Sequence, residues 1–414
     1  MNGPGKIYNT INKCRICGAD SIVDLINYGE QPLANSLKKH RDDVEQKIPL
    51  TLSFCKQSNH VQLKETVNKE LLFSDYIWVT GTAASTKRFA KEFAQRVIQI
   101  TNLQSHELVI EVASNDGTFL VPFKELGFSN VLGVDPAENL KTAALQNGIE
   151  TITAFWNKNV SEEIIKKRGR AKVVMARNVL PHVSQIFDVV EGIRCALQDD
   201  GVAIIEFHNA GTILNELHYD SVYHEHLYYF SINSICYLFE KYSLYPFHAD
   251  PSPISGGGYV LYLSATRKNK SKSLLQFMEQ EESNKVNSHE SWNRFAERCV
   301  EHKRLSREII DKYYGRRVIG FGASARSSTY LNYCEFNSGN IEAVIDNNPM
   351  KQGQFTPGSS IPIISMEGGL RRKPDIIFIL AWNFRHEIIN LCRSKGYRGD
   401  FIVSFPFEPK VIQS

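Results

Sequence analysis

The chain has 414 residues, a formal net charge of +3 and 42% hydrophobic residues. This length favours two or three domains with buried cores, and the small net charge argues against nucleic acid as the main partner. No apolar stretch reaches the roughly 18 residues that a membrane-spanning helix needs, so we expect no membrane partner. The opening residues, MNGPGKIYNT, have neither a basic start nor an apolar centre, which favours a cytoplasmic protein, and we expect a monomer.

Residues 1 to about 72 carry turn signals and short extended runs without a long helical periodicity. This pattern predicts a small, loop-rich module. Of the eight cysteines in the chain, only Cys14 and Cys17 have a close pair spacing. The cysteines therefore form no disulfide framework, and we expect reduced thiols.

From about residue 73 to residue 250, apolar strand-like runs alternate with helical stretches. The runs are LVIEVAS from residue 108, NVLGVD from 130, KVVMARNV from 172 and GVAIIEF from 201. Alternation of this kind predicts a parallel sheet covered by helices.

The first of these runs opens the most informative local sequence, LVIEVASNDGTFL. The residues that end its strand and form the following turn are Glu111, Ala113, Ser114, Asn115, Asp116 and Gly117. The next strand ends in Asp135, and an acid about 20 residues past such a turn can hold ribose hydroxyls. The sequence therefore predicts a ribose-bearing cofactor at the carboxyl edge of the sheet.

The chemistry of this turn distinguishes between cofactors. It lacks the G-x-G-x-x-G that lets backbone approach a pyrophosphate, and Asp116 would repel a diphosphate, so NAD is disfavoured. S-adenosylmethionine has a ribose, no phosphate and a positively charged sulfonium that carboxylates attract. Asn178, at the end of a later strand, offers an amide to the amino-acid part of this cofactor.

A dense group of titratable side chains follows the strand GVAIIEF, in the order Tyr223, His224, Glu225 and His226. Two interpretations compete. His224 and His226 would share one face of an extended segment and could bind a metal. Alternatively, one histidine acts as a general base that a carboxylate orients.

Residues 266 to 314 are rich in charge, and helical spacing in their second half predicts a connecting helix. The runs RVIGFGA from 317, IEAVIDN from 341 and DIIFILAW from 375 then predict a second, smaller α/β unit. Gly320, Gly322 and Ala325 form G-x-G-x-x-A after a strand, and Asp346 ends the next strand. By itself this local pattern fits a nicotinamide-dependent sugar oxidoreductase.

Several motifs together resemble one family. They are the early C-x-x-C, EVASNDGTFL, YHEHLYYFS, SGGGYVLYLS, GFGASARSSTYLNYC and VIDNNPMKQGQFTPGSSIPI, in the family's order over nearly the whole chain. The chain thereby resembles the sugar C-methyltransferases that act on dTDP-linked 4-keto-deoxysugars. The resemblance implies an α/β protein with three domains. They are a zinc-binding module at 1–72, a Rossmann-like class I methyltransferase domain at 73–250, and a Rossmann-like domain at 251–414 that helps to enclose the sugar nucleotide.

The resemblance also implies a reaction, in which S-adenosylmethionine methylates C-3, next to the keto group of the dTDP-sugar. His226 would be the base, with Glu225 and Tyr223 beside it, and Tyr76 would lie at the cofactor and the substrate. Further candidates for substrate contacts are His224, Arg326, Lys351 and Asn383, because Arg and Lys suit diphosphate oxygens. A sugar O-methyltransferase, which needs no neighbouring ketone, stays open as an alternative.

The metal site departs from the family pattern. Four cysteine ligands are implied, but Ser58 stands in place of the fourth, after Cys14, Cys17 and Cys55. A serine hydroxyl is a poor zinc ligand. We therefore expect either that His60 completes a zinc site or that the module is held by packing alone.

Two further departures fall near the cofactor. Ala113 stands where glycine is usual, in a turn that can require the conformational freedom of glycine. Thr80 and Gly81 stand where serines are more usual.

Overall fold

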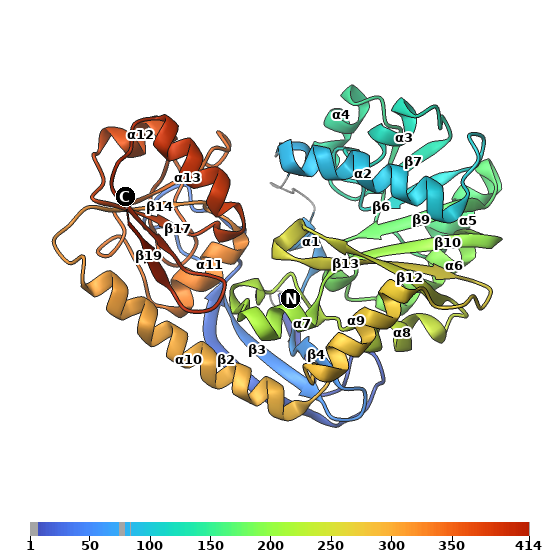
Figure 1. The fold of residues 1–414 in the computed structure, drawn as a ribbon, viewed down its shortest axis with the longest axis horizontal. Helices are drawn as coiled ribbons and strands as arrows, with labels where there is room; N and C mark the ends of the chain where they lie inside the picture. The colour runs from blue at the N-terminus through green and yellow to red at the C-terminus, as the bar shows by residue number, and fades with distance from the viewer. Residues whose placement is uncertain (1–6, 74–78, 83, 414) are drawn as a thin grey trace, which may run out of the picture. The chain divides into compact units, whose positions relative to one another are not determined.

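The computed structural model describes residues 7–73, 79–82 and 84–413, and the chain forms two compact units (Figure 1). Unit 1 comprises Met1–Thr66, Gly211–His226 and Ser288–Ser414, and unit 2 comprises Val67–Ala210 and Leu227–Asn287. No helix in the described part of the chain is long and apolar enough to cross a membrane. All eight cysteines are free thiols.

Unit 2 is built on a seven-stranded sheet in the order β12-β13-β10-β9-β6-β7-β8. Its strands are β6 (Val109–Val112), β7 (Val131–Asp135), β8 (Thr151–Thr153), β9 (Ala171–Arg177), β10 (Leu197–His208), β12 (Tyr245–Ser252) and β13 (Gly258–Ser264). The strands from β10 to β8 are parallel, while β13 and β12 add an antiparallel edge. The four apolar runs of the sequence thus all form strands of one mainly parallel sheet, as predicted.

Helices cover both faces of this sheet (Figure 1). The helices of this unit are α1 (Lys69–Phe73), α2 (Ala84–Thr101), α3 (Val121–Glu125), α4 (Glu138–Gln146), α5 (Lys158–Arg168), α6 (Ile186–Ala196), α8 (Ile232–Glu240) and α9 (Lys272–Ser283). Shorter elements of the unit are the single turns η1 (Thr80–Thr82), η2 (Leu180–His182) and η4 (Ile254–Gly256) and the strand β11 (Tyr228–Tyr229).

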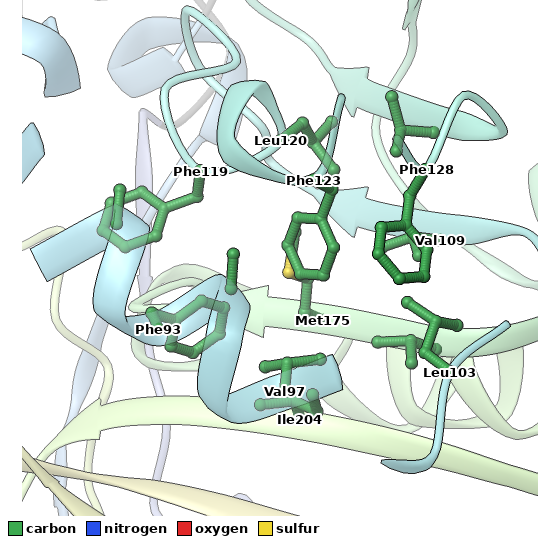
Figure 2. Packing of buried hydrophobic residues seen from close by; sticks show 14 of the residues in the cluster. Phe93, Val97, Leu103, Val109, Phe119, Leu120, Phe123, Phe128, Met175 and Ile204 are labelled. Atoms are coloured by element: carbon green, nitrogen blue, oxygen red, sulfur yellow. The ribbon is translucent and has the colours of Figure 1, made fainter. Parts of the chain in front are cut away.

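The core of unit 2 is aromatic where α2 and the loop after β6 pack on the sheet (Figure 2). Phe93 of α2 packs with Phe119, from the loop after β6, and both belong to one buried cluster with Met175 of β9 and Ile204 of β10. Burying each of these large side chains contributes about 1.5–3 kcal/mol, so the cluster holds α2 and the loop after β6 against the sheet.

Unit 1 begins with an antiparallel sheet in which β4 (His60–Leu63), β3 (Lys47–Cys55) and β2 (Ile22–Pro32) pair in that order. The short strands β1 (Tyr8–Thr10) and β5 (Glu65–Val67) pair with each other. These elements agree with the short extended runs expected for the N-terminal module.

The C-terminal part of unit 1 is a second α/β layer with the strand order β16-β15-β14-β17-β18-β19. Its strands are β14 (Val318–Phe321), β15 (Ala343–Ile345), β16 (Ile363–Ile364), β17 (Ile376–Ile379), β18 (Asp400–Val403) and β19 (Lys410–Ile412). Its helices are α10 (His289–Asp311), α11 (Ala325–Tyr333), α12 (Met366–Arg371) and α13 (Arg385–Ser394), with the single turn η5 (Trp382–Phe384). The predicted connecting helix and second α/β layer are both present.

Unit 1 joins the two ends of the chain. Helices α10 and α11 contact β2, so late elements pack on the N-terminal sheet. The unit also takes in most of α7 (Ala210–Glu216) and the single turn η3 (Tyr219–Ser221), which lie in the middle of the sequence. The sequence divides the chain into three consecutive domains, and those boundaries stay a prediction.

Candidate active site

The residues expected to bind the cofactor gather around the carboxyl end of β6. Strand order reverses there, since β7 and β8 follow on one side of β6 while β9 and β10 lie on the other. Ligands of open α/β sheets bind outside the carboxyl ends of strands at such a switch point. A tight turn follows, in which the Gly117 N–H donates to the Ser114 carbonyl at 2.9 Å. The turn predicted from the sequence is therefore present at the expected edge.

Asp135, at the end of β7, braces this turn. One of its carboxylate oxygens accepts the Asn115 N–H at 2.8 Å, and the other accepts the Ala137 N–H at 2.8 Å. Burial raises the pKa of Asp135, while these two hydrogen bonds oppose that shift. Because each carboxylate oxygen has a second lone pair, Asp135 can still accept a ribose hydroxyl.

Three residues near this edge adopt left-handed backbone conformations. The φ angles of Ala113, Asn115 and Asn178 are +53°, +54° and +53°. Asparagine tolerates this region better than most residues, whereas the Cβ of alanine makes it costly. Ala113 therefore holds a strained conformation that the usual glycine would adopt freely.

The single turn η1 lies against the turn at residues 114–117, which we call the cofactor turn because the cofactor is expected there. The Thr80 N–H donates to Asn115 Oδ1 at 3.0 Å, and the Gly81 N–H donates to Asp116 Oδ2 at 3.0 Å. A Cβ added to Gly81 would stand 2.6 Å from that same Asp116 oxygen. Glycine at this position therefore permits a close approach that serine would obstruct.

A buried charge cluster next to the turn contains two residues that the sequence analysis missed, Arg177 and Glu206. Glu111 on β6, Arg177 on β9 and Glu206 on β10 lie at or near the carboxyl ends of three neighbouring strands and share one face of the sheet. Arg177 Nη1 lies 3.8 Å from Glu111 Oε1, and Arg177 Nη2 contacts Glu206 Oε2. Burial raises the pKa of Glu111 to about 8, against the opposing charge of Arg177. The available signal was a charged residue inside an apolar run, as in VVMAR and AIIEF.

Tyr223 to His226 form a tight turn, and the expectation of an extended segment was wrong. The His226 N–H donates to the Tyr223 carbonyl at 2.8 Å, which closes the turn and brings the first and last side chains together. Tyr223 Oη lies 2.7 Å from His226 Nε2. His226 Nδ1 lies 2.8 Å from the Ser221 carbonyl, which can only accept a hydrogen bond. The proton of the neutral ring is therefore on Nδ1, and the lone pair is on Nε2.

The two middle residues of this turn point into unit 1. His224 Nε2 lies 3.2 Å from the Ile48 carbonyl and 3.1 Å from the Pro49 carbonyl, and burial lowers the pKa of His224. Glu225 accepts a hydrogen bond from Asn35 Nδ2 at 2.6 Å, and burial raises the pKa of Glu225 to about 7. His224 is only 2% exposed, so its surroundings favour a structural role over the expected substrate contact.

Three cysteines converge in the N-terminal module. The sulfur atoms of Cys14, Cys17 and Cys55 all lie within 4.8 Å of one another, with 3.6 Å between those of Cys17 and Cys55. Sulfur atoms of a tetrahedral zinc site with Zn–S bonds of about 2.3 Å would lie about 3.8 Å apart, so this group fits zinc. Within 7–73, 79–82 and 84–413, it is the one group of at least three metal-ligating side chains. A metal held by the two histidines of the Tyr223 turn therefore gains no support.

The fourth position of the cysteine group is occupied by a hydroxyl. Ser58 Oγ lies 3.3 Å from Cys14 Sγ, and the Ser58 N–H donates to Cys55 Sγ at 3.5 Å. His60 pairs with Cys55 across the β3–β4 hairpin and is fully buried, which lowers its pKa to about 3. Its ring does not belong to the sulfur group, so the expectation that His60 completes the site is not supported.

In the C-terminal layer, polar groups of the glycine-rich turn that begins at Gly320 form hydrogen bonds with neighbouring residues of the protein. Ser324 and Ser327 form a reciprocal capping box at the start of α11, where a pyrophosphate would otherwise bind. Asp346 accepts the N–H groups of Ala323 and Asn348, each at 2.9 Å. The local geometry therefore does not favour a dinucleotide.

The expected substrate contacts of this layer have different surroundings. Lys351 Nζ donates to the Ala323 carbonyl at 2.7 Å, close to the glycine-rich turn. Arg326 forms a two-point ion pair with the buried carboxylate of Asp220. Asn383 is half-buried in η5.

Comparisons with known proteins cover nearly the whole chain. The matching family models are described as "Putative zinc binding domain" for residues 14–73, "Methyltransferase domain" for 84–248 and "C-methyltransferase C-terminal domain" for 253–406. The protein named C-methyltransferase NovU, of Streptomyces niveus, is 31% identical over 417 residues, which span 99% of this chain and 98% of the relative. This chain belongs to the C-methyltransferase family.

The C-methyltransferase is therefore an S-adenosylmethionine-dependent enzyme with a Rossmann-like core and an N-terminal module of the zinc-binding type. The family membership decides against the oxidoreductase alternative. The acidic turn without a phosphate cradle fits the charge of S-adenosylmethionine. Tyr76, expected at the cofactor of this C-methyltransferase, lies outside the described residues.

Two solved structures align with less than half of the C-methyltransferase. Magnesium protoporphyrin IX methyltransferase of Synechocystis PCC 6803 aligns with a TM-score of 0.33 at 14% identity, over 43% of this chain and 79% of that chain. The PH0226 protein of Pyrococcus horikoshii OT3 aligns with a TM-score of 0.36 at 13% identity, over 47% of this chain and 97% of that chain. The family assignment rests on neither.

Proposed function

We propose that this C-methyltransferase transfers a methyl group from S-adenosylmethionine to C-3 of a dTDP-linked 4-keto-deoxysugar, in the synthesis of a branched-chain deoxysugar. The single observation that carries the proposal is the orientation of His226. Its Nδ1–H is held by the Ser221 carbonyl at 2.8 Å, so a basic Nε2 is directed at the hydroxyl of Tyr223. Both side chains are half-buried, whereas His224 and Glu225 are buried.

The cofactor supplies an electrophilic methyl group when it is bound. Asp135 would hold its ribose hydroxyls, because it ends β7 at the carboxyl edge of the sheet and each of its oxygens has a lone pair beyond the one that its backbone contact uses. Asn178 would contact the amino-acid part. Glu111 Oε2, buried and without a hydrogen-bond partner among the described residues, would accept from the ammonium group, whose positive charge would displace the proton that burial keeps on this carboxyl in the free enzyme.

His226 would act on the sugar. A carbon next to a ketone is acidic because the electron pair left by its proton delocalises onto the carbonyl oxygen. His226 Nε2 would take the C-3 proton, and the electron pair would move to the C-4 oxygen. The Tyr223 hydroxyl, which donates to His226 Nε2 at 2.7 Å in the absence of a sugar, would then donate to the developing oxyanion instead. As the C-3 carbon bonds the methyl group, the C-4 ketone would form again, and the bond from the methyl group to the cofactor sulfur would break with its electrons left on sulfur.

The C-terminal layer would contribute to sugar-nucleotide binding. Lys351 and Asn383 are the candidates, since a lysine ammonium suits a diphosphate and a side-chain amide suits sugar hydroxyls. Among the residues that the structure describes, Lys351 Nζ reaches a backbone carbonyl at 2.7 Å and a carboxylate oxygen of Asp346 at 3.7 Å and no other polar partner. Its three donors leave one available to a phosphate oxygen.

The direct test is transfer of labelled methyl from S-adenosylmethionine to a panel of dTDP-4-keto sugars and to the same sugars after reduction of the ketone. We expect label on carbon, and only with the ketones, because the reduced sugar cannot form an enolate. Equal labelling of the reduced sugars on oxygen would establish the O-methyltransferase alternative instead.

The base is tested by His226→Asn, whose amide can keep the contact with the Ser221 carbonyl while Nε2 is lost. We expect turnover to fall by ~100- to 10,000-fold with little change in the binding of either ligand. Exchange of the C-3 proton with deuterated solvent, measured by NMR, should disappear as well. Tyr223→Phe is the matched comparison and should retain exchange; His226→Asn with wild-type turnover would refute this role.

A further inference from the structure

The turn that bears His226 is anchored by residues far from it in the sequence. We propose that Asp220, through its ion pair with Arg326, is a positioning residue that fixes the Tyr223–His226 turn for proton abstraction. This inference rests on the proposed function for its kinetic consequence. Its structural consequence, a rigid turn, can be measured without any substrate.

The anchor is a buried, fully paired carboxylate. Asp220 Oδ2 accepts from Arg326 Nε at 2.9 Å, and Oδ1 accepts from Arg326 Nη2 at 2.7 Å. Trp382 Nε1–H donates to Oδ2 at 2.7 Å, and its ring lies under the Arg326 guanidinium at 4.8 Å. The Asp220 side chain is 1% exposed. A two-point pair of this kind fixes direction as well as distance, so it restrains the backbone of η3.

Other residues of the segment 219–226, which contains the turn, are also held by hydrogen bonds to distant parts of the chain. Tyr219 Oη lies 2.8 Å from His302 Nδ1 on α10, and the Val222 carbonyl accepts from Thr329 Oγ1 on α11 at 2.9 Å. Beyond the turn's first residue, His224 and Glu225 are held by the N-terminal module through the contacts described above. The segment is thus attached on both sides of Tyr223 within unit 1.

These anchors matter because the base depends on a backbone group of the same segment. The carbonyl that sets the protonation of His226 belongs to Ser221, which directly follows Asp220. A shift of η3 would move that carbonyl away from Nδ1 and misdirect Nε2. Misplacement of a reacting group by 1 Å can cost ~100-fold in rate.

The geometry also assigns a role to Arg326 that differs from the expected phosphate contact. Two of its donors are committed to Asp220, and its side chain is only 14% exposed. A positioning arginine should affect kcat, whereas a phosphate-binding arginine should affect KM.

The test compares Asp220→Asn, Arg326→Lys and Thr329→Val with Thr329→Ser, which keeps the hydroxyl. Glu45→Gln is the matched control, because Glu45 forms a comparably buried pair with Lys38 in unit 1, at 3.5 Å, and the other side-chain bonds of this pair go to Gly358 and Ser360 rather than to residues 219–226. The readouts are kcat and KM for the sugar nucleotide, affinity for S-adenosylmethionine, and amide hydrogen exchange of residues 219–226.

We expect kcat to fall roughly 10- to 100-fold in Asp220→Asn and Arg326→Lys, with the cofactor affinity unchanged. Thr329→Val should lose roughly fivefold in kcat and Thr329→Ser should restore it, since one hydrogen bond is at stake. Amide exchange in 219–226 should accelerate in the three impaired variants and stay at the wild-type rate in Glu45→Gln.

Wild-type kcat and unchanged amide exchange in Asp220→Asn and Thr329→Val would overturn the inference. So would a raised KM with unchanged kcat in Arg326→Lys, which would restore the phosphate contact. If the wild-type enzyme methylates none of the 4-keto sugars, the proposed function fails, and the exchange rates alone decide whether these residues hold the turn. If Asp220→Asn does not fold, the comparison of Thr329→Val with Thr329→Ser tests the same inference.

Discussion

The Cβ of Ala113 disfavours the left-handed backbone conformation that this residue adopts before the cofactor turn. Its φ of +53° lies in the left-handed region, which costs a residue with a Cβ about 1–2 kcal/mol. Its N–H nevertheless donates to the Val134 carbonyl at 2.7 Å, so the turn is formed despite the strain. The sequence indicated the departure from glycine but not the conformation.

We therefore expect Ala113→Gly to stabilise the protein, although glycine usually destabilises. Release of the left-handed strain should exceed the roughly 0.4–1 kcal/mol that glycine adds to the entropy of the unfolded chain. The net gain should be about 0.5–1 kcal/mol in the free energy of unfolding by denaturant. Ala144→Gly, inside helix α4, should instead lower it, because glycine in a helix interior costs about 0.5–1 kcal/mol relative to alanine.

Glu111 gives a prediction about pH. The folded state keeps a proton on this carboxyl up to a pKa of about 8, whereas the unfolded chain releases it near 4.5. Between those values the folded state binds the extra proton, so stability is highest at low pH and falls as pH rises to about 8. Glu111→Gln cannot titrate, so its free energy of unfolding should decline less between pH 5 and pH 9.

The difference should amount to a few kcal/mol, at about 1.4 kcal/mol for each pKa unit. Burial also raises the pKa of Glu281, to about 7. Glu281→Gln should therefore also reduce the decline in the free energy of unfolding with rising pH, over a narrower pH range. Parallel stability curves for Glu111→Gln and wild type would contradict the assignment of a protonated Glu111.

At the scale of elements, the sequence predicted the strands, but it predicted only some of the polar residues and turns at their carboxyl ends. Runs of Val, Ile and Ala mark strands buried on both faces, and the predicted parallel sheet is confirmed. The turn at Tyr223 was missed because one local hydrogen bond, from the His226 N–H, decides against an extended segment. Arg177 and Glu206 were missed because their pairing depends on strand order, which a sequence does not contain.

The contact between η1 and the cofactor turn predicts an effect of Gly81→Ser. The new Cβ would stand 2.6 Å from Asp116 Oδ2 and from Thr118 Oγ1, so η1 must move away and its N–H contact is lost. We expect roughly tenfold weaker binding of S-adenosylmethionine by calorimetry. Gly368→Ser, in α12 of the other unit, meets only ordinary contacts and should leave the affinity unchanged.

At the scale of the whole molecule, the family and the cofactor could be inferred from motifs, while the make-up of the two units could not. Unit 1 gathers Met1–Thr66, Gly211–His226 and Ser288–Ser414. No composition change marks residue 211 or residue 226, because the segment joins unit 1 through specific contacts such as that of Asp220 with Arg326. Contacts of that kind between distant residues are invisible to local patterns.

Zinc should stabilise the N-terminal module weakly, because Ser58 supplies a hydroxyl where a thiolate is usual. We expect Ser58→Cys to bind zinc more tightly and to show a larger drop in thermal midpoint when a chelator removes the metal. Elemental analysis after gel filtration measures the content directly. His60→Asn should keep the wild-type zinc content; loss of zinc from that variant would reinstate His60 as a ligand.

The composition of unit 1 also bears on the order of events during synthesis. Arg326 and Trp382, which hold Asp220, emerge from the ribosome more than a hundred residues after it, whereas Val67–Asn287 already contains all of unit 2. Contacts between distant residues form late, because their loops are entropically costly to close. A nascent chain can therefore build the fold of unit 2 well before the Tyr223–His226 turn is fixed. On the proposed mechanism, proton abstraction thus begins only after Arg326 and Trp382 have been made.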